Sequence, residues 1–312
     1  GVADSAVRQL LFQGARIAII YLLAVRGLDG SMSIGMISAY VAYLAMFTAR
    51  GSGIVDRLLE YKLLDVPLMR LSDLVFAEEE ASGAGHIAIP PGDIELRHVT
   101  FRYGPNEVPV LQDCSGIVRA GSFVAIAGAS GVGKSSLLQI IAGNEAVSDG
   151  ELLIGGQPAS HWLPADLRRH MAAVFQGDTL FKGSVAENIA LFDPDPDRRR
   201  IRSAARAAFV DREISALAMG YETRIGDLGC VLSRGQVQRV ILARAFYRQP
   251  RLVLLDEATS GLDSDLERRV IRSLAAMTAT RIVVTHSDLM LQAADRVLWV
   301  HEGRLVSSRP DF

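Results

Sequence analysis

The sequence has few cysteines and almost no net charge. Its 312 residues include only two cysteines, Cys114 and Cys230, and the formal net charge is -2 at pH 7. Two such cysteines fit neither a disulfide framework nor a metal site, which excludes a disulfide-stapled secreted domain and indicates a reducing compartment. The small net charge gives no electrostatic reason to expect a nucleic acid partner.

Long uninterrupted apolar runs are also lacking, although 49% of the residues are hydrophobic. Two apolar stretches, in helices expected at about 8–26 and 34–66, are each shorter than the roughly 20 residues that one membrane crossing requires. The first stretch also contains Gln13 and Arg16. A buried hairpin of a soluble protein is therefore one interpretation. We favour a transmembrane hairpin, because small residues such as Gly14 suit helix packing in lipid.

A glycine-rich loop follows an apolar stretch at 123–127 and precedes an apolar helix. Glycines let backbone N–H groups turn toward a phosphate, and the start of a helix adds a favourable dipole. Lys134 supplies a positive charge, and Ser135 supplies a hydroxyl for Mg²⁺. A tight turn that binds nothing is the alternative. The pattern predicts a phosphate site formed by Gly128, Ser130, Gly131, Gly133, Lys134, Ser135 and Ser136.

A second apolar run, 251–255, ends in two carboxylates, Asp256 and Glu257. Such a run is typical of a strand buried on both faces of a parallel sheet, and ligands bind at the carboxyl ends of these strands. Asp256 therefore suits a role at Mg²⁺. Glu257 is placed to polarise the water that attacks the terminal phosphate.

The run Leu232-Ser233-Arg234-Gly235-Gln236 precedes an amphipathic helix. Ser233 and Gln236 have the spacing of a capping box, and Gly235 allows close backbone approach, so this helix start is an anion site in its own right. A second anion site far from the first makes little sense within one subunit. It suggests a head-to-tail pair of subunits.

Together these motifs resemble the nucleotide-binding domain of ABC transporters, over Asp93 to the end of the chain. The resemblance implies an α/β fold of the P-loop NTPase class, with a mixed core sheet, an antiparallel β subdomain and a helical subdomain, preceded by an α-helical transmembrane hairpin. It implies ATP and Mg²⁺ as cofactors. ATP held by Lys134 of one subunit would be covered by Ser233 and Gly235 of the other, in a homodimer whose closure drives transport.

The same resemblance implies roles for further residues. Tyr103 looks like the aromatic residue that stacks on adenine. Gln176 looks like the glutamine that senses Mg²⁺ and the attacking water, Asp263 belongs to the loop that crosses the dimer interface, and His286 looks like the γ-phosphate histidine. The catalytic set is thus Glu257, His286 and Gln176, the metal set is Ser135, Gln176 and Asp256, and Ser233, Gly235, Gln236 and Asp263 join the ATP site.

Two positions depart from the family pattern. Arg234 stands where the family has its first signature glycine, and Gly261 stands where the family usually has alanine. Lys134, Glu257 and His286 are retained, so we expect hydrolysis to survive. A module that only binds ATP is the alternative.

The domain boundaries follow from composition. Residues 1–80 resemble the last part of the transmembrane region of an ABC exporter, 81–92 have linker composition, and 93–312 are the ATP-binding domain. The chain opens without an initiator methionine and with fewer apolar segments than an exporter half would have, so we expect a C-terminal piece of a longer protein.

Residues following the second apolar stretch indicate location and substrate. Arg50, Arg57 and Lys62 suit the cytoplasmic side of a bacterial inner membrane, with the ATPase domain facing the cytoplasm. Residues 38–62 look most like bacterial peptide exporters of the bacteriocin or colicin V type, many of which have a peptidase domain. Exporters of larger proteins, lipids or drugs are alternatives. A non-transport ABC ATPase is a more distant one, because the chain has one cassette and no space for an inserted coiled coil.

Overall fold

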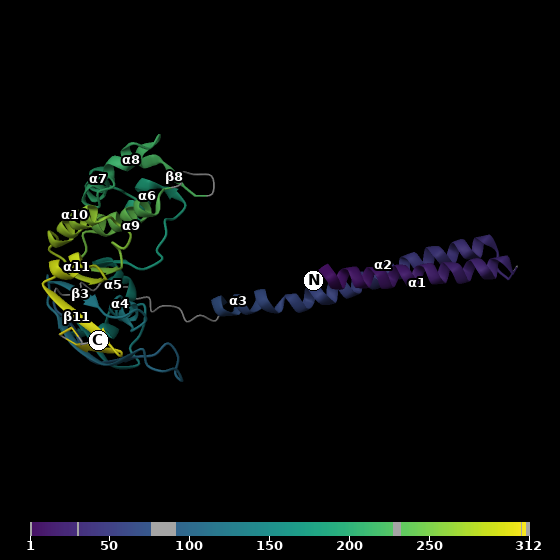
Figure 1. The fold of residues 1–312 in the computed structure, drawn as a ribbon, viewed down its shortest axis with the longest axis horizontal. Helices are drawn as coiled ribbons and strands as arrows, with labels where there is room; N and C mark the ends of the chain where they lie inside the picture. The colour runs from purple at the N-terminus through teal and green to yellow at the C-terminus, as the bar shows by residue number, and fades with distance from the viewer. Residues whose placement is uncertain (1, 30, 76–91, 227–231, 307, 310–312) are drawn as a thin grey trace. The chain divides into compact units, whose positions relative to one another are not determined.

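The structure is a computed structural model, and it describes residues 2–29, 31–75, 92–226, 232–306 and 308–309. The chain divides into two compact units, Gly1–Glu79 and Glu80–Phe312. The first is helical and the second is α/β (Figure 1). The expected linker lies, except for Gly92, outside the described residues, as does Cys230.

The first unit consists of three helices, α1 (Val2–Leu28), α2 (Ile34–Leu63) and α3 (Asp65–Val75). The helices α1 and α2 lie side by side (Figure 1). Ser33 caps α2, because its Oγ atom accepts a hydrogen bond of 3.3 Å from the backbone N–H of Met36. The break before α3 allows Pro67 to lie in the first turn of a helix, where its missing N–H costs little.

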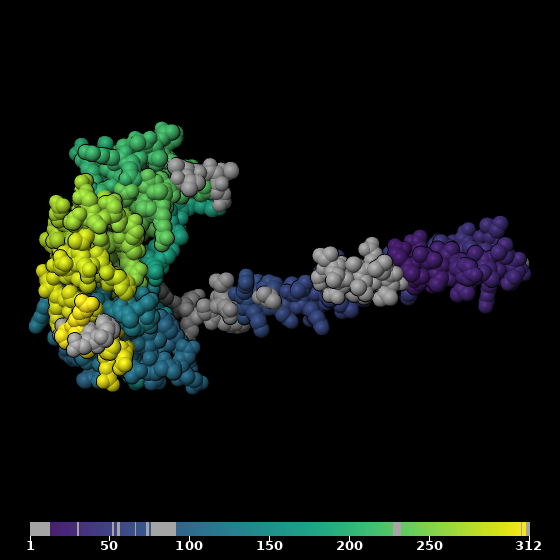
Figure 2. Space-filling view, viewed as in Figure 1, coloured from purple at the N-terminus to yellow at the C-terminus, as the bar shows by residue number. Residues whose placement is uncertain are grey.

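The hairpin exposes large apolar side chains within this unit, among them Ile17 at 68% and Phe47 at 76% exposure. Figure 2 shows the surface of each unit, coloured by position along the chain. Among the residues described, no helix combines enough length with enough apolar character to cross a membrane. Charged residues such as Arg16 and Arg50 interrupt the apolar runs of these long helices.

The second unit is built on a six-stranded sheet with strand order β12-β11-β3-β10-β9-β6. All neighbours are parallel except β12, which pairs antiparallel with β11. The strands β3, β9 and β10 are buried at every position, as expected for continuous apolar runs covered on both faces. Their bounds are β3 (Phe123–Ala127), β6 (Met171–Val174), β9 (Leu252–Asp256), β10 (Thr280–Val284), β11 (Arg296–His301) and β12 (Arg304–Val306).

A four-stranded antiparallel sheet, ordered β2-β1-β4-β5, forms the expected β subdomain. Its buried side chains share one apolar core with the central sheet and with α4, including Leu111, Ile126 and Leu137. This shared core fixes the β subdomain beside the loop between β3 and α4. The strands are β1 (Ile94–Phe101), β2 (Leu111–Val118), β4 (Asp149–Ile154) and β5 (Gln157–Pro158).

A helical subdomain has its own core, in which Ile201 and Ile214 pack against Val240 of α9. Figure 1 shows α7 and α8 at the opposite end of this unit from β3 and β11. This subdomain comprises β7 (Gly183–Ser184), α6 (Val185–Ala190), α7 (Arg198–Ala207), α8 (Asp211–Ser215), the 3₁₀ turn η2 (Gly220–Glu222) and β8 (Arg224–Ile225). The other elements are α4 (Lys134–Ile141), the 3₁₀ turn η1 (Ala159–His161), α5 (Pro164–His170), α9 (Arg234–Arg248), α10 (Ser264–Ala275) and α11 (Asp288–Ala293).

Candidate active site

Three loops meet at one edge of the six-stranded sheet. The strands β3, β10 and β9 are parallel neighbours, and in their register Val284 lies opposite both Ile126 and Asp256. The loop after β3 begins at Gly128, β9 ends at Asp256, and His286 follows β10. Ligands of open α/β sheets bind at this carboxyl edge. The fold therefore gathers the predicted phosphate, acidic and histidine positions on one side of the sheet.

The phosphate loop ends at Gly133, the residue that precedes the first turn of α4. Gly133 has a φ of 100°, and a Cβ atom there would lie 2.8 Å from Cδ2 of Leu111, so only glycine fits. The Nζ atom of Lys134 donates to the carbonyl oxygens of Gly128 at 3.0 Å and Ala129 at 2.6 Å. Lys134 thus lies inside its own loop. Phosphate oxygens of a nucleotide are the acceptors that could replace these carbonyls.

Lys134 is almost fully buried, at 6% exposure. Burial lowers the pKa of Lys134, and the nearby carboxylates of Glu257 and Asp256 oppose that shift. A buried ammonium group beside two carboxylates is a strong local charge arrangement. Such a cluster of interacting charges in a buried position is typical of a functional site.

The residues predicted to hold Mg²⁺ include a contacting pair. The side chain of Ser135 hydrogen-bonds to Asp256. Burial raises the pKa of Asp256, and the hydrogen bond from Ser135 opposes the shift. Oxygen ligands of this kind, completed by water and phosphates, are what Mg²⁺ prefers, so these residues fit the metal. Within the described ranges, no group of three or more His, Cys, Asp or Glu residues could itself hold a metal ion.

Two of the predicted catalytic residues, Gln176 and His286, lie near the third, Glu257, which follows β9. The Nε2 atom of His286 is 3.5 Å from Oε1 of Glu257. A cavity of about 170 Å³ is lined by both Gln176 and Glu257, and also by Asp256 and Arg234. Gln176 is exposed on the loop that follows β6. The cavity can hold a water molecule between the carboxylate of Glu257 and the amide of Gln176.

Tyr103 is fixed next to the phosphate loop with an exposed ring. Its hydroxyl lies 2.9 Å from Oγ of Ser136 in α4, and its ring packs edge-to-face on Phe101 with 4.8 Å between centroids. The side chain is nevertheless 60% exposed. An aromatic face held open beside a phosphate loop suits stacking with a base.

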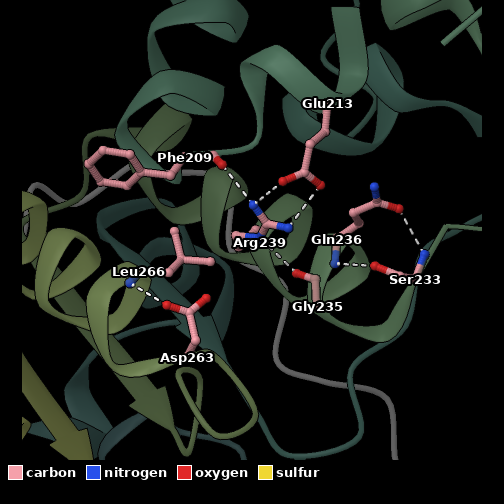
Figure 3. A network of polar contacts seen from close by, with 8 residues as sticks. All are labelled: Phe209, Glu213, Ser233, Gly235, Gln236, Arg239, Asp263 and Leu266. Carbon is pink, nitrogen blue, oxygen red and sulfur yellow. Dashed lines mark hydrogen bonds and ion pairs between the residues drawn. The ribbon is translucent and has the colours of Figure 1, made fainter. Parts of the chain in front are cut away.

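The start of α9 has the predicted capping box (Figure 3). The backbone N–H of Gln236 donates to Oγ of Ser233 at 3.3 Å, and the backbone N–H of Ser233 donates to Oε1 of Gln236 at 2.8 Å. Within the described residues, no hydrogen bond or ion pair joins 233–236 to the loop 128–135. Arg234 nevertheless lies near a predicted catalytic residue of its own subunit, because it lines the same cavity as Glu257.

Asp263 caps α10, accepting hydrogen bonds from the backbone N–H groups of Asp265 at 3.1 Å and Leu266 at 3.0 Å. The bond from Leu266 is the main reason that the pKa of Asp263 is lowered. Gly261, in the preceding loop, has a φ of +92°. The departure from alanine at Gly261 therefore fits a left-handed backbone that a Cβ would strain.

The structure adds a residue that sequence reasoning missed, the almost buried Arg239 (Figure 3). Its guanidinium donates to both carboxylate oxygens of Glu213, at 2.6 and 2.9 Å, and to the carbonyl oxygen of Phe209 at 2.8 Å. Its Nε atom donates to the carbonyl oxygen of Gly235 at 3.1 Å. Arg239 therefore links the first turn of α9 to α8. In the sequence, the signal that could have pointed to Arg239 was its position one helical turn after Gly235.

A phosphate loop between a strand and a helix, with an acidic strand end beside it, defines a P-loop nucleotide-binding domain. Residues 111–260 match the family model described as ABC transporter. The second unit therefore contains an ABC transporter ATP-binding domain, the ATPase part of such transporters.

Relatives of the chain are transport proteins. It is 35% identical to the colicin V secretion/processing ATP-binding protein CvaB of Escherichia coli, over 91% of this chain and 41% of that protein. It is also 35% identical to the mycobactin import ATP-binding/permease protein IrtB of Mycolicibacterium smegmatis, over 96% of this chain and 53% of that protein. A solved structure of a bacterial Atm1-family ABC exporter with ATP bound has a TM-score of 0.70 and 28% identity, over 97% of this chain and 53% of that one. The chain thus spans about half or less of these relatives.

Proposed function

We propose that this chain forms the ATP-hydrolysing part of an ABC exporter. The observation that carries the proposal is the 3.5 Å approach of His286 to Glu257 at the sheet edge that also carries Lys134. Lys134 would bind the phosphates, and Ser135, Gln176 and Asp256 would hold Mg²⁺. The metal supplies charge neutralisation on the phosphates. Glu257 orients the attacking water, and His286 contacts the terminal phosphate.

Two copies work as a head-to-tail homodimer in this proposal. Ser233 and Gly235 of one copy cover the ATP held by the loop of the other, which explains why the start of α9 makes no bond to its own loop among the described residues. Closure of the dimer is driven by ATP binding, and hydrolysis reopens it. A γ-phosphate and its metal hold other molecular switches in the same way.

The whole protein is proposed to act in a bacterial inner membrane, with the ATPase domain facing the cytoplasm and a peptide as the exported substrate. Residues 2–75 would belong to its permease part. Support comes from the exposed apolar side chains of α1 and α2, and from the near-complete coverage of this chain by an exporter structure. The secretion function in the name of CvaB supports a peptide.

The test is ATP turnover by the complete protein in lipid vesicles, with and without peptides that carry a double-glycine leader. We expect turnover that the peptide stimulates and that Glu257→Gln abolishes while ATP binding persists. ATP turnover that peptides do not change would still support an ATPase. The substrate would then be sought among larger proteins, lipids, drugs or a compound such as the mycobactin named for IrtB. A wild type no faster than Glu257→Gln would overturn the proposal.

A further inference from the structure

The backbone of Glu257 adopts a left-handed conformation, with a φ of +51°. A residue with a Cβ atom is strained there, and such strain persists only where the surrounding structure enforces it. Two backbone hydrogen bonds do so: the N–H of Glu257 donates to the carbonyl oxygen of Val284 at 3.0 Å, and the N–H of Ser260 donates to the carbonyl oxygen of Glu257 at 3.0 Å. These two bonds fix Glu257 between the end of β10 and the turn that follows β9.

A third hydrogen bond comes from a side chain of another element. The Nε2 atom of Gln238 in α9 donates to the carbonyl oxygen of Glu257 at 3.2 Å. The Oε1 atom of Gln238 faces the loop at Gly261, where an added Cβ would meet it at 3.9 Å. Gln238 thus contacts the first residue of the turn that follows β9, and its amide oxygen faces the other end of that turn.

The position of Gln238 connects the two predicted ATP-contacting regions. Residues 234, 237, 238 and 241 share one face of α9, and this face lines the cavity that also contains Glu257. The same helix begins at the capped Ser233. A movement of α9 that follows contact of Ser233 with a nucleotide would therefore act directly on the Glu257 backbone.

We propose that Gln238 is a positioning residue for Glu257. Its amide holds the Glu257 carbonyl, keeps the strained backbone in place and so aims the carboxylate toward His286 and the attacking water. Through this bond the position of the signature helix α9 controls the geometry of the catalytic carboxylate. The inference rests on the proposed ATPase function and adds a residue to it.

A packing role alone would not need an amide at this position. Gln238 is only half-buried and lines a polar cavity, whereas the residues that build the apolar core beside it are Ile241 and Leu242. Methionine has the length and volume of glutamine but no donor. Gln238→Met therefore removes the hydrogen bond and preserves the packing.

The test measures kcat and KM for ATP hydrolysis by the complete protein in lipid vesicles. Gln238→Met is expected to lower kcat about tenfold or more, because small misplacements of a catalytic group are costly, and to leave KM nearly unchanged. Gln157→Met, an exposed position in β5, is the matched control and should match the wild type. Gln238→Asn, whose amide is too short to reach, should behave as Gln238→Met does.

Three outcomes would overturn the inference. Full kcat in Gln238→Met and Gln238→Asn would show that the hydrogen bond has no catalytic effect. A joint loss of kcat, ATP affinity and thermal stability would show that Gln238 only supports the fold. Wild-type ATP turnover no faster than that of Glu257→Gln would overturn the proposed function, on which the inference rests. This third result is distinct because it compares only the wild type with Glu257→Gln and does not involve the Gln238 variants.

Discussion

The imidazole of His286 lies 3.5 Å from the carboxylate of Glu257, although the two residues follow different strands. They meet because β10 and β9 are parallel neighbours that end at the same edge. The side chain of His286 is 53% exposed and that of Glu257 is 27% exposed. Both groups can therefore reach a ligand that enters from the edge of the sheet.

His286→Ala should lower kcat for ATP hydrolysis by about a hundredfold, the usual size of a general acid–base or phosphate-orienting contribution. ATP affinity should change little, because Lys134 and the phosphate loop are untouched. Steady-state kinetics and equilibrium binding of ATP check the two halves of this prediction. His161→Ala, on the exposed turn η1, is the matched control. A similar loss in both variants would mean that His286 has no special role.

Substitutions of Tyr103 test binding of the base separately from binding of the phosphates. Tyr103→Ala removes the exposed ring and should raise KM for ATP about tenfold, since stacking of a base on an aromatic ring contributes 1–3 kcal/mol. Tyr103→Phe loses only the contact with Ser136 and should stay within a factor of about two of the wild type. Inhibition by inorganic triphosphate, which has no base, should be equal in all three proteins. Weaker inhibition in Tyr103→Ala would show that Tyr103 supports the phosphate loop instead.

The sequence predicted the parts of the site that are contiguous in the chain. The loop at 128–135 and the acidic end of β9 each follow an apolar run that the fold buries on both faces. The capping box at Ser233 was predictable because it depends on residues within one turn. Such motifs carry their structural context in their neighbours.

Contacts between separate elements could not be predicted in this way. Glu213 and Arg239 are 26 positions apart, and their ion pair depends on how α8 packs against α9. The left-handed backbone at Glu257 was equally hidden, because residues other than glycine rarely adopt it. It is enforced by the hydrogen bond that its N–H donates to β10 and by the bonds that its carbonyl oxygen accepts from the following turn and from α9.

Ser233 distinguishes a nucleotide held by its own subunit from one held by a partner. Ser233→Arg should abolish turnover and leave ATP binding nearly unchanged, because Ser233 forms no bond with its own phosphate loop among the described residues. Ser203→Arg, at an exposed position of α7, controls for the added charge and bulk. Turnover and binding of a fluorescent ATP analogue are the measurements. If binding fell as far as turnover, the start of α9 would serve the nucleotide of its own subunit.

The contacts of Arg239 predict that its loss lowers the free energy of unfolding. Arg239→Met removes the bonds to Glu213, Phe209 and Gly235, and leaves a carboxylate and two carbonyl oxygens without their donor. Breaking a buried pair costs about 3–5 kcal/mol, but Glu213 is 39% exposed and water can compensate, so we expect a loss of about 2 kcal/mol. Urea denaturation measures it. Arg212→Met, an exposed position on α8, should change little, and equal stability of the two variants would contradict the prediction.

A double-mutant cycle tests whether Glu213 is the partner that matters. Glu213→Gln alone should destabilise the protein because it weakens the two charge-assisted bonds from Arg239. In the combined variant with Arg239→Met, the loss should be smaller than the sum of the single losses, since both changes remove the same interaction. Turnover should follow the same pattern, because the pair anchors the turn that presents Gly235. Additive losses would mean that Arg239 stabilises α9 through the carbonyl oxygens of Phe209 and Gly235, independently of the ion pair.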